Sequence, residues 1–424
     1  MTTVQGNREQ GVVRGQGEGT VVTVDEVRSQ FPALRRMHLG QPVAYFDGPG
    51  GTQVPRQVAD AMSDYLLHHN ANTHWAYPTS EETDAAIAEA RTALAALLNA
   101  APNEVAFGAN MTTLAFHLAR ALGRGWGPGD EVIITELDHH ANQAPWRAIE
   151  RERGITIRVA PINLETYELD WAALEKLFTT RTRLLAISAG SNALGTMPDV
   201  AKATRLAHAA GALCFVDAVH YTPHGLVDVR AIDCDFLACS AYKYYGPHIG
   251  VLYGKAERLA TLDVPKLQPA PDTIPERMET GTQNHEGIVG AGAAVRFLAS
   301  MGGGSDLRAR VVSAMTALQV RERQLFARLW DEMGAMAGVT RHGPPPSRPR
   351  TPTLSFTIRG LTPERAARAL AKQGLFVSHG DYYASTVVER LGLQPDGMIR
   401  VGCSCYTDEN EIERLVAAVA ELSK

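Results

Sequence analysis

The sequence has little of several features that mark specialised classes of protein. Cysteine is scarce: there are five, with no CxxC pair and no spacing typical of metal ligands, which argues against a disulfide framework and gives no reason to expect a metal site. No apolar run is long enough to cross a bilayer, and the polar start MTTVQGNREQGVVRGQGEGT lacks the apolar core of a signal peptide. We therefore expect a cytoplasmic protein without a membrane partner, with a disordered extension over residues 1–22.

An excess of either charge is also missing. The formal net charge is −5, with 21% charged residues and no basic stripe, so the sequence gives no reason to expect a nucleic-acid partner. Small molecules are the expected partners. The length of 424 residues exceeds that of a usual single domain and predicts a large and a small domain.

Short apolar runs alternate with Ala-rich helical stretches between about residues 80 and 255. This alternation predicts an α/β fold with a doubly wound, mostly parallel sheet. The expected strands are EVIITEL (131–137), TIRVAPI (156–162), RLLAIS (183–188), ALCFVD (212–217) and DFLACS (235–240).

Helix and loop signals divide the rest of the chain. Thr79 followed by Glu82 has capping-box spacing and predicts a helix that runs to Leu98. MGGGSD (301–306) interrupts a helical pattern, and GPPPSRPRTP (343–352) is a Pro-rich loop. Beyond that loop we expect a compact α+β domain with strands TLSFTI, GLFVS and MIRVGCS, a helix begun by Thr362-Pro363, and a last helix from about Asp408.

Two strand ends carry residues of complementary chemistry. Lys243 follows the strand that ends CS, and Asp217 ends the strand FVD, one helical crossover earlier. Ligands of open α/β sheets bind beyond the carboxyl ends of the strands. A lysine there can form a Schiff base with pyridoxal phosphate, and an aspartate can keep the pyridine nitrogen protonated. The pair therefore predicts a pyridoxal phosphate site.

Other strand ends could complete this site. FGANMTTLAFHLAR (107–120) reads as a strand end, a turn and a helix start, where phosphate would fit at Met111 and Thr112. His139, in DHHANQAPW, could stack on the pyridine ring. Asn192, in SNALGT, could donate a hydrogen bond to the pyridine hydroxyl oxygen.

These motifs, with CSAYKYYGPHIGVLYGK and ETGTQNHEG, resemble the class V aminotransferase fold, in particular its cysteine desulfurase-like group. The resemblance extends from about residue 24 to near the end of the chain. It implies the fold type I of pyridoxal phosphate-dependent transferases, with a seven-stranded, mostly parallel sheet and a smaller α+β C-terminal domain. The expected divisions are an N-terminal segment on the small domain (23–45), a cofactor-binding large domain (46–300) and a small domain (301–424).

The resemblance also implies roles for individual residues. Lys243 would be the Schiff-base lysine and Asp217 the partner of the pyridine nitrogen, with His139 stacked on the ring. His220 stands where the family often has a glutamine near the cofactor's hydroxyl group. The implied assembly is a homodimer with active sites at the subunit interface. The implied phosphate contacts are Thr112, Ser240, Tyr242 and, from the partner subunit, Thr282.

The substrate side of the site follows from the same resemblance. Arg400, in MIRVG, resembles the arginine that grips the substrate carboxylate, a task suited to the guanidinium fork. FDGPGGTQVP (46–55) resembles the loop that lines the substrate pocket, where Gly50 and Gly51 permit close approach of the backbone.

One loop departs from the desulfurase pattern. Cysteine desulfurases accept sulfur on a loop cysteine, whereas the matching loop VSHGDYYAS (377–385) has Tyr383 at that place. A phenol cannot carry a persulfide. The loop's polar and aromatic residues instead suggest that it recognises a larger substrate or moves protons; they are His379, Asp381, Tyr382 and Tyr383. Cys403 and Cys405 could in principle replace the missing thiol, but strand alternation more simply makes them core residues.

The preferred hypothesis is a C–S lyase that performs β-elimination on an S-substituted cysteine. The first alternative is a decarboxylative oxidative deaminase that uses oxygen. A cysteine desulfurase, an aminotransferase, an epimerase and a non-catalytic scaffold also stay open. Lys243, Asp217 and Arg400 together argue against the scaffold.

Overall fold

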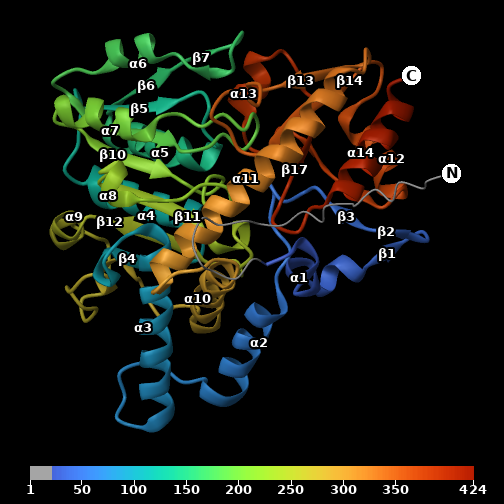
Figure 1. Ribbon diagram of the computed structural model, residues 1–424. Helices are drawn as coiled ribbons and strands as arrows, with labels where there is room; N and C mark the ends of the chain where they lie inside the picture. Colours follow the sequence, from blue (N-terminus) through green and yellow to red (C-terminus); the bar gives the residue numbers. More distant parts are fainter. Residues whose placement is uncertain (1–21) are drawn as a thin grey trace.

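The computed structural model describes residues 22–424, so nearly all of the extension expected over residues 1–22 lies outside the described residues. A seven-stranded sheet forms the larger part of the molecule, and a four-stranded sheet forms the smaller part beside it (Figure 1). The α/β class and the seven strands are as expected.

The large sheet is mostly parallel. Its order is β4-β12-β11-β10-β9-β5-β6, and only β12 runs antiparallel to its neighbours β11 and β4. Strand β12 was not predicted from the sequence, because its run GVLYG is short and bounded by glycines. The strands are β4 (Val105–Gly108), β5 (Glu131–Thr135), β6 (Thr156–Ala160), β9 (Thr182–Ser188), β10 (Leu213–Asp217), β11 (Phe236–Ser240) and β12 (Gly250–Gly254).

Both faces of this sheet are buried. On β10, for example, Cys214 and Val216 belong to one apolar cluster and Phe215 to the other, since successive side chains point to opposite faces. Continuous apolar runs are expected for a sheet covered on both sides. The helices of this part are α2 (Arg56–Asp64), α3 (Pro78–Leu98), α4 (Met111–Gly123), α5 (Ala144–Arg153), α6 (Trp171–Leu177), α7 (Val200–Ala209), α8 (Val229–Ile232), α9 (Ala256–Thr261) and α10 (His285–Ser300).

The start of α3 corrects the sequence analysis. The helix begins at Pro78, and its N-cap is Tyr77, whose side chain makes no cap hydrogen bond. Proline is pre-organised for the first helical position, so the helix starts before Thr79, and the predicted capping box does not form. Glu82 instead contacts His69, with 2.6 Å between Oε2 and Nδ1.

The small sheet has the order β13-β14-β17-β16. The expected strand GLFVS is wrong as a single strand: β15 (Leu375–Phe376) pairs with β3 (Ala44–Tyr45), and β16 (Ser378–Gly380) pairs with β17 (Met398–Gly402). Thr362 caps α12, and Asp408 caps α14 with a capping box, as expected. The remaining elements are β13 (Val339–His342), β14 (Thr353–Ile358), α12 (Pro363–Lys372), α13 (Ser385–Arg390) and α14 (Glu409–Leu422).

Helix α11 (Leu307–Gly334) joins the two parts (Figure 1). Its first half packs in the core beside the large sheet, through residues such as Val311 and Leu318, and its second half packs under the small sheet, through Phe326 and Leu329. The boundary between residues 300 and 301 stays a proposal, because this helix belongs to both cores.

The segment before residue 46 contacts the small domain. The backbone N–H of Ala44 donates to the Gly374 carbonyl at 2.8 Å, and Arg28 on α1 (Val24–Ser29) lies 3.2 Å from Asp408 and 3.1 Å from Glu411. Two hairpins of two-residue strands complete the strands of residues 22–424: β1 (Met37–His38) with β2 (Gln41–Pro42), and β7 (Ile162–Asn163) with β8 (Glu168–Leu169). Among residues 22–424, no helix is both long and apolar enough to span a membrane.

Candidate active site

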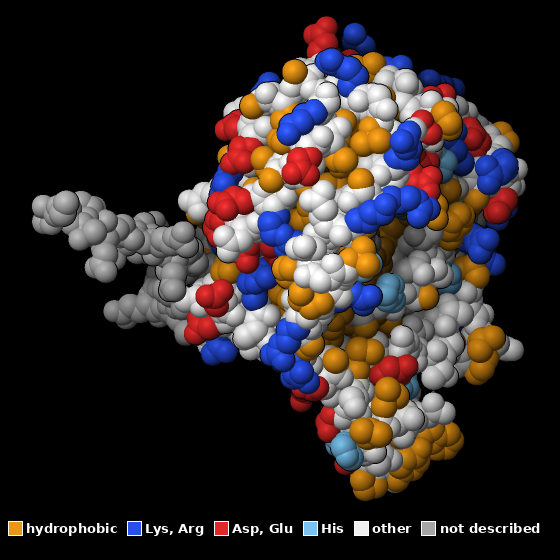
Figure 2. Space-filling model, turned by 90° about the vertical axis from the view of Figure 1, so that its right-hand side faces the viewer, with side chains coloured by type: hydrophobic (Ala, Val, Ile, Leu, Met, Phe, Trp, Pro, Cys, Tyr) orange, Lys and Arg blue, Asp and Glu red, His pale blue; other side chains and the backbone are white. Residues whose placement is uncertain are grey.

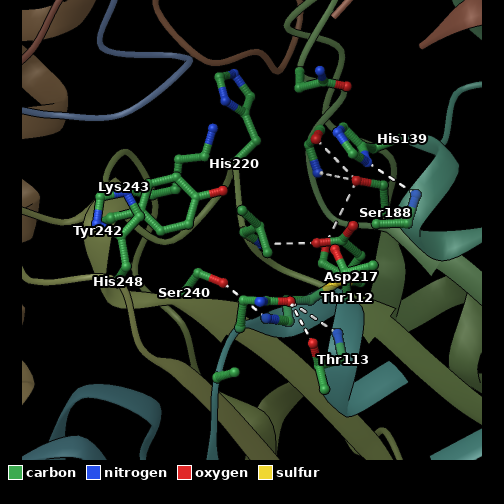
Figure 3. A pocket seen from close by; sticks show the side chains of 17 residues that line it. Thr112, Thr113, His139, Ser188, Asp217, His220, Ser240, Tyr242, Lys243 and His248 are labelled. Carbon is green, nitrogen blue, oxygen red and sulfur yellow. Dashed lines mark hydrogen bonds between the residues drawn. The ribbon is translucent and has the colours of Figure 1, made fainter. Parts of the chain in front are cut away.

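A cavity of about 620 Å³ lies beyond the carboxyl ends of β9, β10 and β11, next to the start of α4. Figure 3 shows Lys243, Tyr242, His248 and Ser240 on one side of it, with His139, Ser188 and Asp217 on the other. Strand ends meet here because β9, β10 and β11 are parallel neighbours.

Lys243 is buried at the wall of this cavity, with 8% of its surface exposed. Its Nζ donates hydrogen bonds to the carbonyls of Pro49 at 2.5 Å and Gly50 at 3.1 Å. Burial, and then the nearby Arg400 guanidinium, lower the pKa of Lys243 to about 7, although Asp217 opposes the shift. A substantial fraction of the amine is therefore neutral, and thus nucleophilic, near pH 7.

Asp217 is also buried, and its Oδ1 accepts a hydrogen bond from the Val219 backbone N–H at 2.9 Å. Burial raises the pKa of Asp217 to about 6, with the Val219 N–H and Lys243 opposing the shift. At pH 7 the carboxylate is mostly ionised, and a cationic ring nitrogen beside it would favour that form.

Asp138 is a buried carboxyl group close to this site that the sequence analysis missed. It accepts hydrogen bonds from the Thr135 backbone N–H at 2.9 Å and from the Asn142 side chain at 3.2 Å. Burial is the main cause that raises the pKa of Asp138 to about 7, and the charge of Asp217 adds to the rise. The sequence shows Asp138 only as the residue before a histidine pair, and burial, which sets its pKa, is not visible there.

His139 is held in one tautomer. Its Nδ1 accepts a hydrogen bond from the Ala141 backbone N–H at 2.9 Å, so in the neutral ring the proton is on Nε2. Burial, followed by the charges of Lys243 and Arg400, lowers the pKa of His139 to about 4. The ring that lines the cavity is therefore neutral at physiological pH and suited to stacking.

The expected phosphate contacts gather where β11 meets α4. The Met111 backbone N–H donates to Ser240 Oγ at 3.0 Å, which ties the end of the strand to the start of the helix. Thr112 lies in the first turn of α4 and lines the same cavity. Tyr242 stacks on His248, with ring centroids 4.9 Å apart. His248 and Ser188, which also line the cavity, were not identified from the sequence.

His220 and Asn192 connect the cavity to the small domain. His220 Nε2 lies 3.1 Å from the hydroxyl of Thr351 and 2.9 Å from that of Thr353. Asn192 donates from Nδ2 to the Tyr382 carbonyl at 2.9 Å, whereas its Oδ1 is buried without a partner in the described chain. The side-chain amide of Asn192 thus keeps the acceptor Oδ1 and the second N–H of Nδ2 for a ligand.

Arg400 lies beside the loop that contains Gly50 and Gly51. It is buried, its Nη1 donates to the Asn192 carbonyl at 2.9 Å, and its Nε has no partner within residues 22–424. Burial lowers the pKa of Arg400 to about 10. A Cβ atom at Gly50 would lie 3.5 Å from Arg400 Nη2, and one at Gly51 would lie 3.3 Å from the Tyr242 ring. Glycine therefore keeps space open beside the guanidinium.

The loop of Asp381, Tyr382 and Tyr383 covers this region. The Tyr382 ring lies over the Arg400 guanidinium at 4.1 Å, and its hydroxyl donates to the Met398 carbonyl. Tyr383 is 73% exposed, and its ring centroid is 5.5 Å from that of His139. Asp381 Oδ1 accepts a hydrogen bond from the Tyr383 backbone N–H at 3.0 Å. The loop therefore places a phenol, not a thiol, against the cavity histidine.

Thr282 does not line the Lys243 cavity. It is exposed and lines a separate cavity of about 460 Å³, which shares Ala109 and Thr113 with the Lys243 cavity. Among the described residues, no group of three or more His, Cys, Asp or Glu side chains is placed to hold a metal ion.

This chain is similar in sequence and in fold to proteins of one known family. The description "Aminotransferase class-V" belongs to the family profile that matches residues 44–415. A cysteine desulfurase of Dickeya dadantii is 33% identical over 95% of this chain and 97% of its own length. The chain belongs to the class V aminotransferase family. Solved structures agree: the cysteine desulfurase of Thermococcus onnurineus NA1 has a TM-score of 0.85 at 26% identity, over 94% of this chain and 98% of its own. The cysteine desulfurase CsdA of Escherichia coli has a TM-score of 0.82 at 27% identity, over 96% and 100%.

This class V enzyme is therefore pyridoxal phosphate-dependent, like its family. The side chains that line the cavity also have the chemistry that this cofactor needs. A buried lysine with a lowered pKa, a buried carboxylate and an unpartnered amide oxygen line one cavity. The cavity volume of about 620 Å³ lies within the range of pockets for small ligands, about 300–1,000 Å³.

Proposed function

We propose that this protein is a C–S lyase that eliminates a thiol from an S-substituted cysteine. The observation that carries the proposal is the chemistry of the loop opposite His139, where Tyr383 is exposed and no thiol is present. All five cysteines are buried, and burial raises the pKa of both Cys403 and Cys405. A sulfur acceptor needs an exposed thiol with a low pKa, so these cysteines do not suit sulfur transfer.

The geometry supports the following proposed roles of the residues. Arg400 would bind the substrate carboxylate through its guanidinium, whose Nε lacks a partner in the described chain. His139 would stack on the cofactor ring, and Asp217 would stay ionised beside the ring nitrogen. The phosphate would lie at the start of α4, near Thr112, Ser240 and Tyr242. When bound, pyridoxal phosphate supplies a ring that accepts electrons from Cα of the amino acid.

Lys243 is the proposed base. With a pKa of about 7, its amine can take the Cα proton near neutral pH. The Cβ–S bond then breaks, and both of its electrons leave with sulfur as a thiolate. The remaining three-carbon aminoacrylate is then hydrolysed by one water molecule, which releases pyruvate and ammonia. Tyr383, close to His139 and open to solvent, is placed to orient the leaving group or to give it a proton.

One experiment separates this activity from its alternatives. The purified holoenzyme is incubated with a panel of cysteine S-conjugates and with free L-cysteine, with and without oxygen. We expect equal amounts of thiol and pyruvate, independent of oxygen. Oxygen uptake with carbon dioxide would indicate the oxidative deaminase, and alanine with a protein persulfide would indicate a desulfurase, the activity named for its relatives; either result would refute the lyase.

The proposed assembly is a homodimer. Helices α2 and α3 and the segment between them, which includes a turn of π-helix (Tyr65–His69), extend from the body of the molecule (Figure 1). Exposed apolar side chains gather at the lower end in Figure 2, and those of this extension are Leu66, Leu67, Trp75 and Tyr77. An apolar patch of this kind favours a protein partner. Residues 72–75 and Thr282 line one cavity of about 770 Å³, so the patch adjoins the residue expected to reach the partner's site.

The five free cysteines support the proposed cytoplasmic location.

A further inference from the structure

A second cavity, of about 310 Å³, lies on the other side of His220 from the Lys243 cavity, and the two share no lining residue. One wall is a single face of α11, with Gln319, Glu322, Arg323 and Phe326 at helical spacing. The opposite wall is the Pro-rich loop, from Pro346 to Pro352. Thr351 in this loop is hydrogen-bonded to His220 at 3.1 Å.

The inner end of this cavity has an unsatisfied acceptor. Glu322 is 2% exposed, and its Oε2 accepts a hydrogen bond from His224 Nδ1 at 3.1 Å. Its Oε1 is buried and has no hydrogen-bond partner within residues 22–424. A buried carboxylate oxygen without a donor is costly, so a ligand that brings an N–H donor to Glu322 would be stabilised.

The loop supplies the opposite charge. The Arg350 guanidinium lies 4.1 Å from the centre of the Phe326 ring. It donates to the Leu194 carbonyl at 3.3 Å, but its Nη1 is buried without a partner in the described chain. Its other contacts are with the Thr351 and Thr353 carbonyls and the Trp330 ring. Burial lowers the pKa of Arg350 to about 9. Two further arginines, Arg323 and Arg348, are exposed at the same cavity.

We propose that this cavity binds a small zwitterion of the amino-acid class, with its ammonium group at Glu322 and its carboxylate toward Arg348 and Arg350. A single ligand bound in this way would give hydrogen-bond partners to both the buried acceptor, Glu322 Oε1, and the buried donor, Arg350 Nη1. The volume suits a small amino acid, since ligand pockets start at about 300 Å³. Within the part of the chain that the structure describes, no lysine lines the cavity, so it would be a binding site and not a second catalytic centre. The inference does not depend on which reaction the enzyme performs.

The test uses ligands that cannot react with the cofactor. N,N-dimethylglycine and the N,N-dimethyl derivatives of β-alanine and 4-aminobutyrate keep an N–H donor and a carboxylate at three spacings, but a tertiary amine cannot condense with an aldehyde. Binding to the holoenzyme is measured by calorimetry in the Arg400→Gln background, which removes the proposed carboxylate contact of the active site. We expect at least one of the three to bind, and glycine betaine, which has no N–H, to bind about tenfold more weakly than N,N-dimethylglycine or not at all.

Variants assign the binding to this cavity. Glu322→Gln should weaken binding about tenfold or more, and Arg348→Gln, at an exposed position, should weaken it several-fold without affecting the fold. Arg368→Gln, an exposed arginine that pairs with Glu364 on α12, is the matched control and should change nothing. The proposal is overturned if none of the three ligands binds at millimolar concentration, or if their affinity survives Arg348→Gln. Arg348→Gln therefore keeps the test decisive even if Glu322→Gln does not fold.

Discussion

At the scale of single residues, the proton of Lys243 is expected to control cofactor capture. Its pKa of about 7 lies below the ordinary value, so the amine is cationic below pH 7 and neutral above it. The rate at which apoenzyme captures pyridoxal phosphate should therefore fall about tenfold for each pH unit below 7 and level off above it. Stopped-flow absorbance measures this rate. Arg400→Gln removes one cause of the lowered pKa and should move the midpoint upward; a midpoint near 10 in the unmodified protein would contradict the assignment.

Asp217 allows a nearly isosteric test. Asp217→Asn keeps the size of the side chain but removes the negative charge proposed to hold the ring nitrogen protonated. We expect kcat to fall by about 10²-fold or more, the scale of a lost acid–base partner, with little change in the melting temperature. Steady-state kinetics and thermal unfolding give the two readouts. Unchanged kcat would show that the carboxylate has no part in the reaction.

Single residues also show what the sequence could predict. Lys243 and Asp217 were identifiable because each stands at or just beyond the end of an apolar strand, and parallel strands bring their ends together. Asp138 and Ser188 also stand at or just beyond strand ends, but nothing in the sequence distinguishes a buried carboxyl or a cavity hydroxyl from an ordinary polar residue. Cys403 and Cys405 are buried as expected, although they lie in the loop after β17 and not on the strand itself. Burial depends on the packing of α11 and α14, which local patterns do not encode.

At the scale of elements, the loop that carries Tyr383 has unusual backbone geometry. Tyr382 and Tyr383 both have positive φ, 55° and 58°, a region that costs non-glycine residues about 1 kcal/mol or more. Asparagine tolerates this region better than tyrosine does. Tyr383→Asn should therefore leave stability unchanged or higher but reduce turnover. Urea unfolding and steady-state kinetics measure the two effects.

A companion variant separates the ring of Tyr383 from its hydroxyl. Tyr383→Phe keeps the contact with His139 but removes the phenol, so turnover should fall only if the hydroxyl orients the leaving group or moves a proton. If Tyr383→Asn and Tyr383→Phe both left kcat unchanged, this loop would have no role in the reaction.

Helix ends show the limits of local signals. The capping box at Asp408 forms as the sequence predicts, because Glu411 follows at the required spacing and no proline competes. Asp408→Ala should destabilise the protein by about 1 kcal/mol, measurable as a lower urea midpoint, whereas Asp396→Ala, outside any helix, should not. At α3 the same spacing fails because Pro78 begins the helix one residue before Thr79. Local spacing therefore predicts a helix end only where no stronger start signal lies beside it.

At the scale of the whole molecule, the apolar extension predicts the oligomeric state. Leu67 is 74% exposed and Trp75 is 61% exposed, and burying both in a dimer would remove this apolar surface from water. Leu67→Asp with Trp75→Asp should therefore convert a dimer to a monomer in light scattering. Val320→Asp, at an apolar position that is 50% exposed on α11, is the control and should leave the mass unchanged.

Shared active sites can be tested by mixing subunits. If Thr282 contributes to the site of the partner, Lys243→Ala and Thr282→Ala homodimers should each be impaired, because every site then lacks one residue. A mixed dimer has one complete site, formed by Lys243 of one subunit and Thr282 of the other. Random re-association of equal amounts of the two variants should then restore about a quarter of wild-type activity. Half of the dimers are mixed, and each mixed dimer has one working site out of two. No recovery would show that Thr282 does not act in the partner's site, and a fully active Thr282→Ala enzyme would place Thr282 outside the catalytic site.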